Sequence, residues 1–89
     1  MGSSVTAYSC PCCGNLTLGD QPPGTFEVCP VCYWEDDDVQ YRDPQLRGGA
    51  NKVSLCEART NYASIGASSE EFVGQVRAPR QKELPGHAG

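Results

Sequence analysis

Two cysteine pairs are the residues of this sequence best suited to chemistry. Cys10 and Cys13 form one C-x2-C motif, Cys29 and Cys32 form a second, and 15 residues lie between the pairs. This spacing matches a common pattern of zinc sites. Two thiolates on one tight turn can both lie about 2.3 Å from an ion, and a second turn then completes a tetrahedron. The sequence therefore predicts one structural zinc ion held by these four cysteines.

The same cysteines leave alternatives open. An iron centre resembling that of rubredoxin, acting as an electron carrier, uses the same two turns, although four-thiolate structural zinc is the more common site. Cys12 lies beside Cys13, and we expect its thiol to point away from the ion. If a nearby metal lowers its pKa, Cys12 is instead a reactive thiol with a redox function. Cys56 has no partner at metal spacing, so we expect it to be a packed helix residue.

Short strands must position the two cysteine pairs. Residues 5–8, 16–18 and 26–28 carry the β-branched, aromatic and apolar side chains that are typical of strands. Residues 19–24 contain two prolines and flanking glycines, which favour a turn. We predict that residues 16–18 pair antiparallel with residues 26–28. The expected fold is a small metal-bound α+β domain with a hairpin like that of a zinc ribbon or rubredoxin.

One or two helices should follow an irregular acidic segment. Ser54 and Glu57 form a capping box, apolar residues recur behind it at helical spacing, and Gly66 stands where a helix ends. A second, weaker helix precedes Pro79. We predict one domain over residues 5–78, with the metal-binding part at 5–34 and the helical part at 53–78. Residues 79–89, with the solvated His87, are predicted to be a disordered tail.

Composition explains why a metal would be needed. Leu, Ile, Val and Phe make up only 15 of 89 residues, and the formal net charge is −4. A domain this small and this poor in large apolar residues needs disulfides, a metal or a partner subunit. Structural zinc supplies roughly 10–16 kcal/mol of binding free energy in small peptides. Removal of the metal is therefore expected to unfold the first 35 residues.

The net charge and the first residues of the sequence restrict the classes of ligand and the cellular compartment that we expect for this protein. An acidic chain is a poor ligand for nucleic acids, and no apolar run is long enough to span a membrane. The start has no basic leader or apolar stretch, so we expect a cytoplasmic protein with reduced thiols. The sequence leaves the oligomeric state open. A single histidine and the lack of a phosphate-binding loop give no catalytic constellation, so no enzymatic activity is expected.

An aromatic pair followed by an acidic run offers a candidate interaction surface. Tyr33 and Trp34 come directly after the second cysteine pair, and Glu35 to Asp38 are all acidic. One interpretation is that Trp34 covers the metal turn and that a solvated acidic loop follows. The other is an aromatic anchor with an acidic rim for a basic partner. The expected function is thus a structural zinc-binding module that mediates protein–protein interaction.

The motifs also resemble a known family. The segments CPCCG, EVCPVCYWEDD, GGAN and VSLCEARTNYASIG are similar to those of the cysteine-rich CPCC family of small bacterial proteins. The resemblance extends from about Tyr8 to Gly66. It implies a cysteine-bound metal module and implies no particular reaction.

Overall fold

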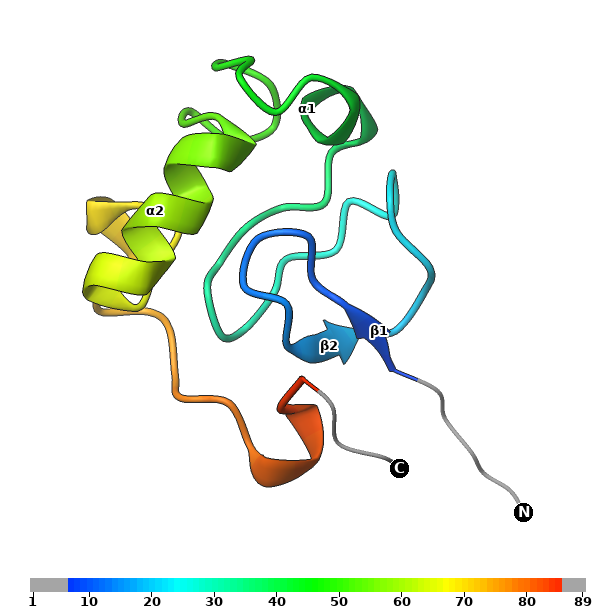
Figure 1. The fold of residues 1–89 in the computed structure, drawn as a ribbon, viewed down its shortest axis with the longest axis vertical. Coiled ribbons are helices and arrows are strands. Elements are labelled where there is room, and N and C mark those ends of the chain that lie inside the picture. The colour runs from blue at the N-terminus through cyan, green and yellow to red at the C-terminus, as the bar shows by residue number, and fades with distance from the viewer. Residues whose placement is uncertain (1–6, 86–89) are drawn as a thin grey trace.

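The computed structural model describes residues 7–85 of the chain. Figure 1 shows α2 beside the strand-containing half of the molecule, with α1 at one end and the last 3-10 helix at the other. Within the described residues the elements are β1 (Tyr8–Ser9), β2 (Leu16–Leu18), α1 (Asp38–Arg42), α2 (Leu55–Ile65) and the 3-10 helices η1 (Glu70–Phe72) and η2 (Gln81–Glu83). The protein is thus a small α+β domain.

Two hairpins make up the cysteine-bearing half, and each one encloses its own cysteine pair. In the first, β1 and β2 pair antiparallel, with Tyr8 opposite Leu18. In the second, Val28 pairs with Glu35, and the Cys29 amide donates to the Trp34 carbonyl at 3.0 Å. The loop over residues 19–24 joins the two hairpins.

This pairing corrects the predicted hairpin, in which residues 16–18 would pair with residues 26–28. The prediction is wrong because a C-x2-C turn reverses the chain within five residues. The segments on either side of such a turn are therefore adjacent and can pair directly. The longer segment between the two cysteine pairs becomes a connection between hairpins and is not itself a hairpin turn.

Helix α2 forms where the capping signals predicted it. The Glu57 amide donates to Ser54 Oγ at 3.1 Å, and the Ser54 amide donates to the Glu57 carboxylate at 2.9 Å. Gly66 ends the helix in a left-handed conformation, with φ of 75°. Leu55 and Ala58 are buried against the cysteines, whereas Ile65, at the end of the predicted apolar stripe, is exposed.

The second predicted helix is wrong, because residues 70–72 form only the 3-10 helix η1. Ser69 stands before it, but its side chain makes no capping hydrogen bond. The preceding residue, Ser68, uses its amide to donate to the Cys32 carbonyl at 2.7 Å. Contact with the second cysteine turn therefore fixes this segment, and its intrinsic helix propensity does not decide its conformation.

The acidic run is largely buried, in contrast to the expected solvated loop. Asp36 accepts hydrogen bonds from the amide and the hydroxyl of Thr25, at 3.0 and 2.8 Å. Asp37 caps α1, accepting from the Val39 amide at 2.8 Å, and also accepts from the Ala50 amide at 2.8 Å. These bonds hold the pKa of Asp37 below its ordinary value, the Ala50 amide being the main cause. The run thus initiates a short helix that the sequence did not predict.

Residues 77–85 return to the cysteine-bearing half, although the sequence predicted a disordered tail from residue 79. The Arg77 amide donates to the Pro30 carbonyl at 3.3 Å. The Arg77 guanidinium donates to both carboxylate oxygens of Glu83, at 2.8 and 2.9 Å. The buried Glu83 belongs to η2, which packs on β2. His87 lies outside the described residues.

Cysteine is a main component of the core. Nine buried residues form one cluster between the hairpins and α2, namely Cys10, Cys12, Leu18, Cys29, Val31, Cys32, Trp34, Leu55 and Ala58. Four of the nine are cysteines, so the interior is built around sulfur atoms and contains few large apolar side chains. Both halves of the domain therefore depend on how these sulfurs are held.

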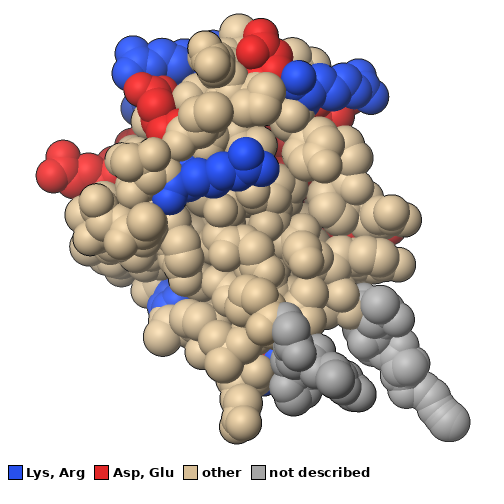
Figure 2. Space-filling view, in the orientation of Figure 1, with Lys and Arg blue, Asp and Glu red and all other residues tan. Residues whose placement is uncertain are grey.

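Two observations concern the surface and the environment. On the face drawn in Figure 2, basic side chains lie among acidic ones at the end that carries α1, and the rest of this face is largely uncharged. No helix among residues 7–85 is long and apolar enough to cross a membrane.

Candidate metal centre

The first cysteine turn is closed by backbone hydrogen bonds around Cys10. The Gly14 amide donates to the Cys10 carbonyl at 2.8 Å, and the Cys10 amide donates to the Asn15 carbonyl at 2.9 Å. Gly14 has φ of 79°, a conformation that glycine adopts without steric cost. The turn directs Cys10 and Cys13 toward the core.

The second turn repeats this geometry with a tyrosine in place of the glycine. The Tyr33 amide donates to the Cys29 carbonyl at 2.7 Å. Tyr33 has φ of 70°, which costs roughly 1–2 kcal/mol for a residue with a Cβ atom. Its ring lies against Phe72, with 4.7 Å between the ring centroids, and this contact offsets part of the cost.

Together the two turns place four sulfur atoms in one small volume. The Sγ atoms of Cys10 and Cys32 are 3.6 Å apart, and those of Cys13 and Cys29 are 3.7 Å apart. All four ligand atoms lie within 4.8 Å of one another. A tetrahedral site with metal–sulfur distances of about 2.3 Å requires sulfur–sulfur distances of about 3.8 Å. These four cysteines are therefore placed to hold a metal ion.

Disulfide bonds do not compete for these sulfurs. A disulfide has a sulfur–sulfur distance near 2.05 Å, much shorter than the separations in the cluster. All six cysteines of the chain are free thiols in the structure.

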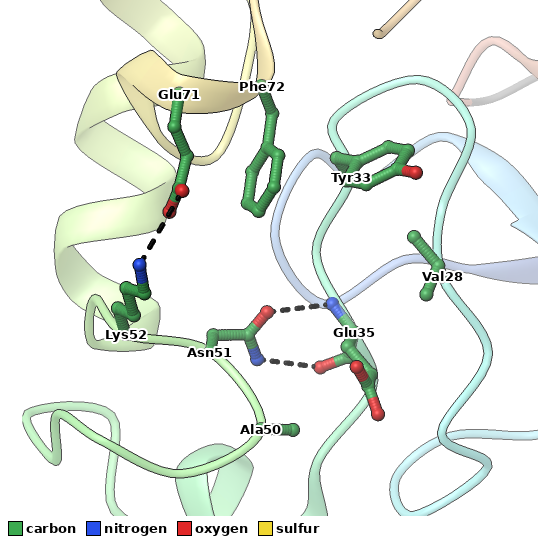
Figure 3. A pocket seen from close by; sticks show the side chains of 8 residues that line it. All are labelled: Val28, Tyr33, Glu35, Ala50, Asn51, Lys52, Glu71 and Phe72. Atoms are coloured by element: carbon green, nitrogen blue, oxygen red, sulfur yellow. Dashed lines mark hydrogen bonds and ion pairs between the residues drawn. The ribbon is translucent and has the colours of Figure 1, made fainter.

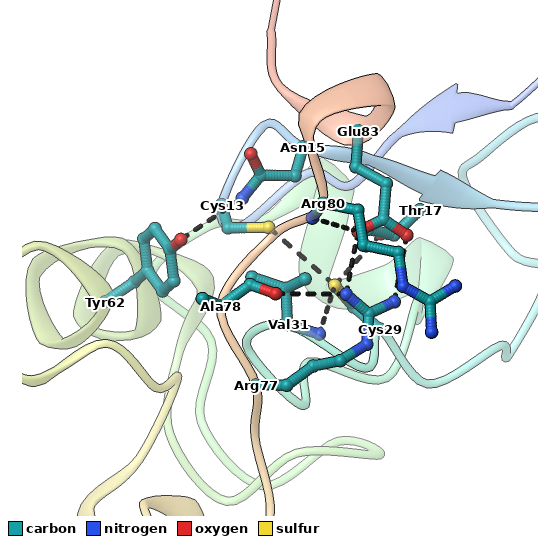
Figure 4. Close-up of polar contacts among 10 residues, drawn as sticks. All are labelled: Cys13, Asn15, Thr17, Cys29, Val31, Tyr62, Arg77, Ala78, Arg80 and Glu83. Atoms are coloured by element: carbon teal, nitrogen blue, oxygen red, sulfur yellow. Dashed lines mark hydrogen bonds and ion pairs between the residues drawn. The ribbon is translucent and has the colours of Figure 1, made fainter.

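Polar groups around Cys29 complete the centre (Figure 4). The Thr17 hydroxyl lies 3.0 Å from Cys29 Sγ, and the Val31 amide donates to the same sulfur at 3.4 Å. Hydrogen bonds from neighbouring thiols, above all Cys10, hold the pKa of Cys29 well below its ordinary value. Hydrogen bonding with Cys10 has the opposite effect on Cys32, whose pKa is raised. The four crowded thiols thus perturb one another's protonation, and a metal ion held by four thiolates would take the place of their protons.

The chain also matches a known protein family. The family model described as "Cysteine-rich CPCC" matches residues 8–83, which include both hairpins, α2 and most of the C-terminal segment. The chain belongs to the cysteine-rich CPCC family. No curated protein gives a significant match to the chain.

The other two cysteines of this CPCC protein do not belong to the group of four sulfurs. Cys12 is 8% exposed and belongs to the core, but it is not one of the four grouped sulfurs. Cys56 is exposed, so the prediction of a packed helix residue is wrong. Its neighbour Leu55 takes the buried position of the first helical turn, and adjacent residues of a helix do not share a face.

The candidate partner residues of this CPCC protein are divided between core and surface. Trp34 is 0% exposed and packs in the core, so its ring is not available at the surface. Tyr33 and Glu35 instead line a pocket of about 160 Å³. Phe72 lines the same pocket, and sequence reasoning missed it because nothing in the local pattern connects residues so far apart in the chain.

Proposed function

We propose that the chain is a structural zinc module whose folded surface binds a protein partner. The main support is the spacing of the sulfurs, which are 3.6 Å apart in Cys10 and Cys32 and 3.7 Å apart in Cys13 and Cys29. These separations are close to the edge of a zinc–thiolate tetrahedron. Four thiolates use all the positions of such a site, which is the pattern of structural zinc and leaves no position for substrate.

The core supports a structural role for the ion. Cys10, Cys29 and Cys32 are among the most deeply buried residues, and they contact the few large apolar side chains. In a core of this kind, zinc binding contributes free energy to folding directly. We also propose a reducing compartment such as the cytoplasm, because free thiols persist there.

Metal analysis of matched cysteine variants tests the zinc assignment. We expect one zinc per chain in the purified protein. Cys13→Ser should lose the metal because it removes one ligand, whereas Cys12→Ser should keep it because Cys12 is not one of the four grouped sulfurs. Elemental analysis by mass spectrometry gives both identity and stoichiometry.

Other results of that experiment would overturn the proposal in different ways. Iron at one per chain, with visible absorption, would support the rubredoxin-like electron carrier. Equal loss of metal from both variants would show that the ligand set is different. Rapid labelling of Cys12 by a thiol reagent while the metal stays bound would favour a redox function, although its burial argues against ready access.

A further inference from the structure

A pocket beside the second cysteine turn is separate from the sulfur cluster (Figure 3). Its volume is about 160 Å³, and its walls come from segments far apart in the chain. The second hairpin supplies Val28, Tyr33 and Glu35, the segment before α2 supplies Lys52, and η1 supplies Glu71 and Phe72.

One wall of the pocket is apolar and aromatic. The rings of Tyr33 and Phe72 are in contact, with an interplanar angle of 42°. Val28 is 44% exposed, although its backbone belongs to the second hairpin. Tyr33 has a left-handed backbone, and its ring forms part of the pocket wall. A cation with an apolar stem can pack against such a surface.

Carboxylates supply the other wall. The side-chain amide of Asn51 holds both backbone groups of Glu35. Its oxygen accepts a hydrogen bond from the Glu35 N–H at 2.9 Å, and its nitrogen donates one to the Glu35 carbonyl at 2.8 Å. Within residues 7–85, no hydrogen bond or ion pair engages the Glu35 carboxylate. Glu71 pairs with the exposed Lys52 at 3.7 Å, an exposed contact of little energetic value.

The charges of this pocket do not balance. Two carboxylates and one ammonium line it, and the whole chain carries a net charge of −4. We propose that the pocket binds an arginine side chain from a basic segment of a protein partner. A guanidinium stacks on aromatic rings and pairs with carboxylates through two parallel hydrogen bonds, and a point charge such as lysine makes both interactions less well. This inference rests on the proposed function and identifies the chemistry of the partner.

A titration of the full zinc-loaded chain tests the pocket. The probe is a capped five-residue peptide with one central arginine among glycines, and a peptide with citrulline at that position is the uncharged control. We expect the amide resonances of Val28, Tyr33 and Phe72 to shift with the arginine peptide and to stay in place with the citrulline peptide. The effect should weaken as salt is added, because exposed charges are screened.

Matched carboxylate variants then locate the binding. Glu35→Gln should weaken the arginine peptide at least about fivefold by removing its charged acceptor. Glu70→Gln should leave the affinity unchanged, because Glu70 is exposed and does not line the pocket. Equal binding to both variants, shifts scattered over other acidic residues, or no shifts at all would overturn the inference. Zinc measured in each sample separates the two proposals: a full zinc load without peptide binding refutes the pocket alone, whereas a folded chain without metal refutes the zinc module.

Discussion

Arg77 and Glu83 show how single residues tie the C-terminal segment to the second cysteine turn. The Arg77 guanidinium lowers the pKa of the Glu83 carboxyl to about 2, with a further contribution from the Arg80 amide. The pKa of Arg77 is raised, mainly by its hydrogen bond to Glu83 and in part by the charge of Cys29. The guanidinium is therefore placed to offset negative charge both on Glu83 and on the sulfur cluster.

This ion pair gives a pH dependence with a definite sign. Because the pKa of Glu83 is lower in the folded protein than the ordinary 4.5, its stabilisation is present above about pH 4.5 and is lost as the pH falls toward 2. Glu83→Gln should therefore destabilise the protein near neutral pH, and the difference from the wild type should shrink below about pH 4.5. Urea unfolding of both proteins at a series of pH values measures this difference. A difference that stays constant from pH 7 down to pH 4, in samples that still hold their zinc, would contradict it.

For single residues, the sequence spacing predicted which cysteines lie together, but the sequence did not predict which acidic side chains are buried. The pairs Cys10/Cys13 and Cys29/Cys32 follow from spacing alone, because a C-x2-C turn brings its own two thiols together. The burial of Asp37 does not follow, because one of its hydrogen-bond donors is the amide of Ala50, in a later loop. A run of acidic residues in the sequence does not show which backbone amides from other segments will lie close enough to donate hydrogen bonds to it.

Among the elements, α1 is joined to the loop that precedes α2 by one buried side chain. Gln40 donates through Nε2 to the carbonyls of Leu46 and Val53, at 2.9 and 3.0 Å. The Gln40 side-chain oxygen also accepts a hydrogen bond from the backbone N–H of Asn51 at 3.0 Å. Gly49 lies directly against this arrangement: a Cβ atom there would be 2.8 Å from Gln40 side-chain carbons and 2.7 Å from Asp37 Oδ2.

Two glycine-to-alanine variants test this packing. Gly49→Ala should destabilise the protein by about 1–3 kcal/mol, because Gln40 or Asp37 must move and lose hydrogen bonds. Gly74→Ala is the matched control, since no atom lies within 4 Å of its added Cβ and its backbone does not require glycine. Its effect should be neutral or slightly stabilising, through loss of chain entropy in the unfolded state. Urea unfolding of the zinc-loaded proteins measures both, and equal effects would show that the close contact is not limiting.

The elements that sequence predicted correctly are those with local signals. Helix α2 has a capping box at Ser54 and a terminal Gly66, both within the helix and its caps. The partner of β2 was missed because strand pairing depends on which segments the cysteine turns bring together. The segment after Gly66 was misread as an α-helix because its position depends on the carbonyl of Cys32.

The whole molecule shares one sulfur-rich core, and this has a consequence for metal removal. The sequence predicted that chelation would unfold the first 35 residues, and the structure extends this expectation to α2. Leu55 and Ala58 of α2 lie in the same cluster as the cysteines, so we expect the helix to unfold with the hairpins in a single transition. Circular dichroism at 222 nm during chelation measures this, and re-addition of zinc should restore the signal. A helical signal that survives complete metal removal would contradict the prediction.

Tyr33 belongs to two sites at once, since its backbone closes the second cysteine turn and its ring forms a wall of the pocket. If the ion holds the second cysteine turn, then releasing the ion frees both this turn and the aromatic wall of the pocket. The two ligands are then thermodynamically linked, and the linkage is reciprocal. Whatever factor the ion adds to the affinity for a basic peptide, the peptide adds to the affinity for the ion, so a bound partner would raise the chelator concentration needed to remove half of the metal at equilibrium.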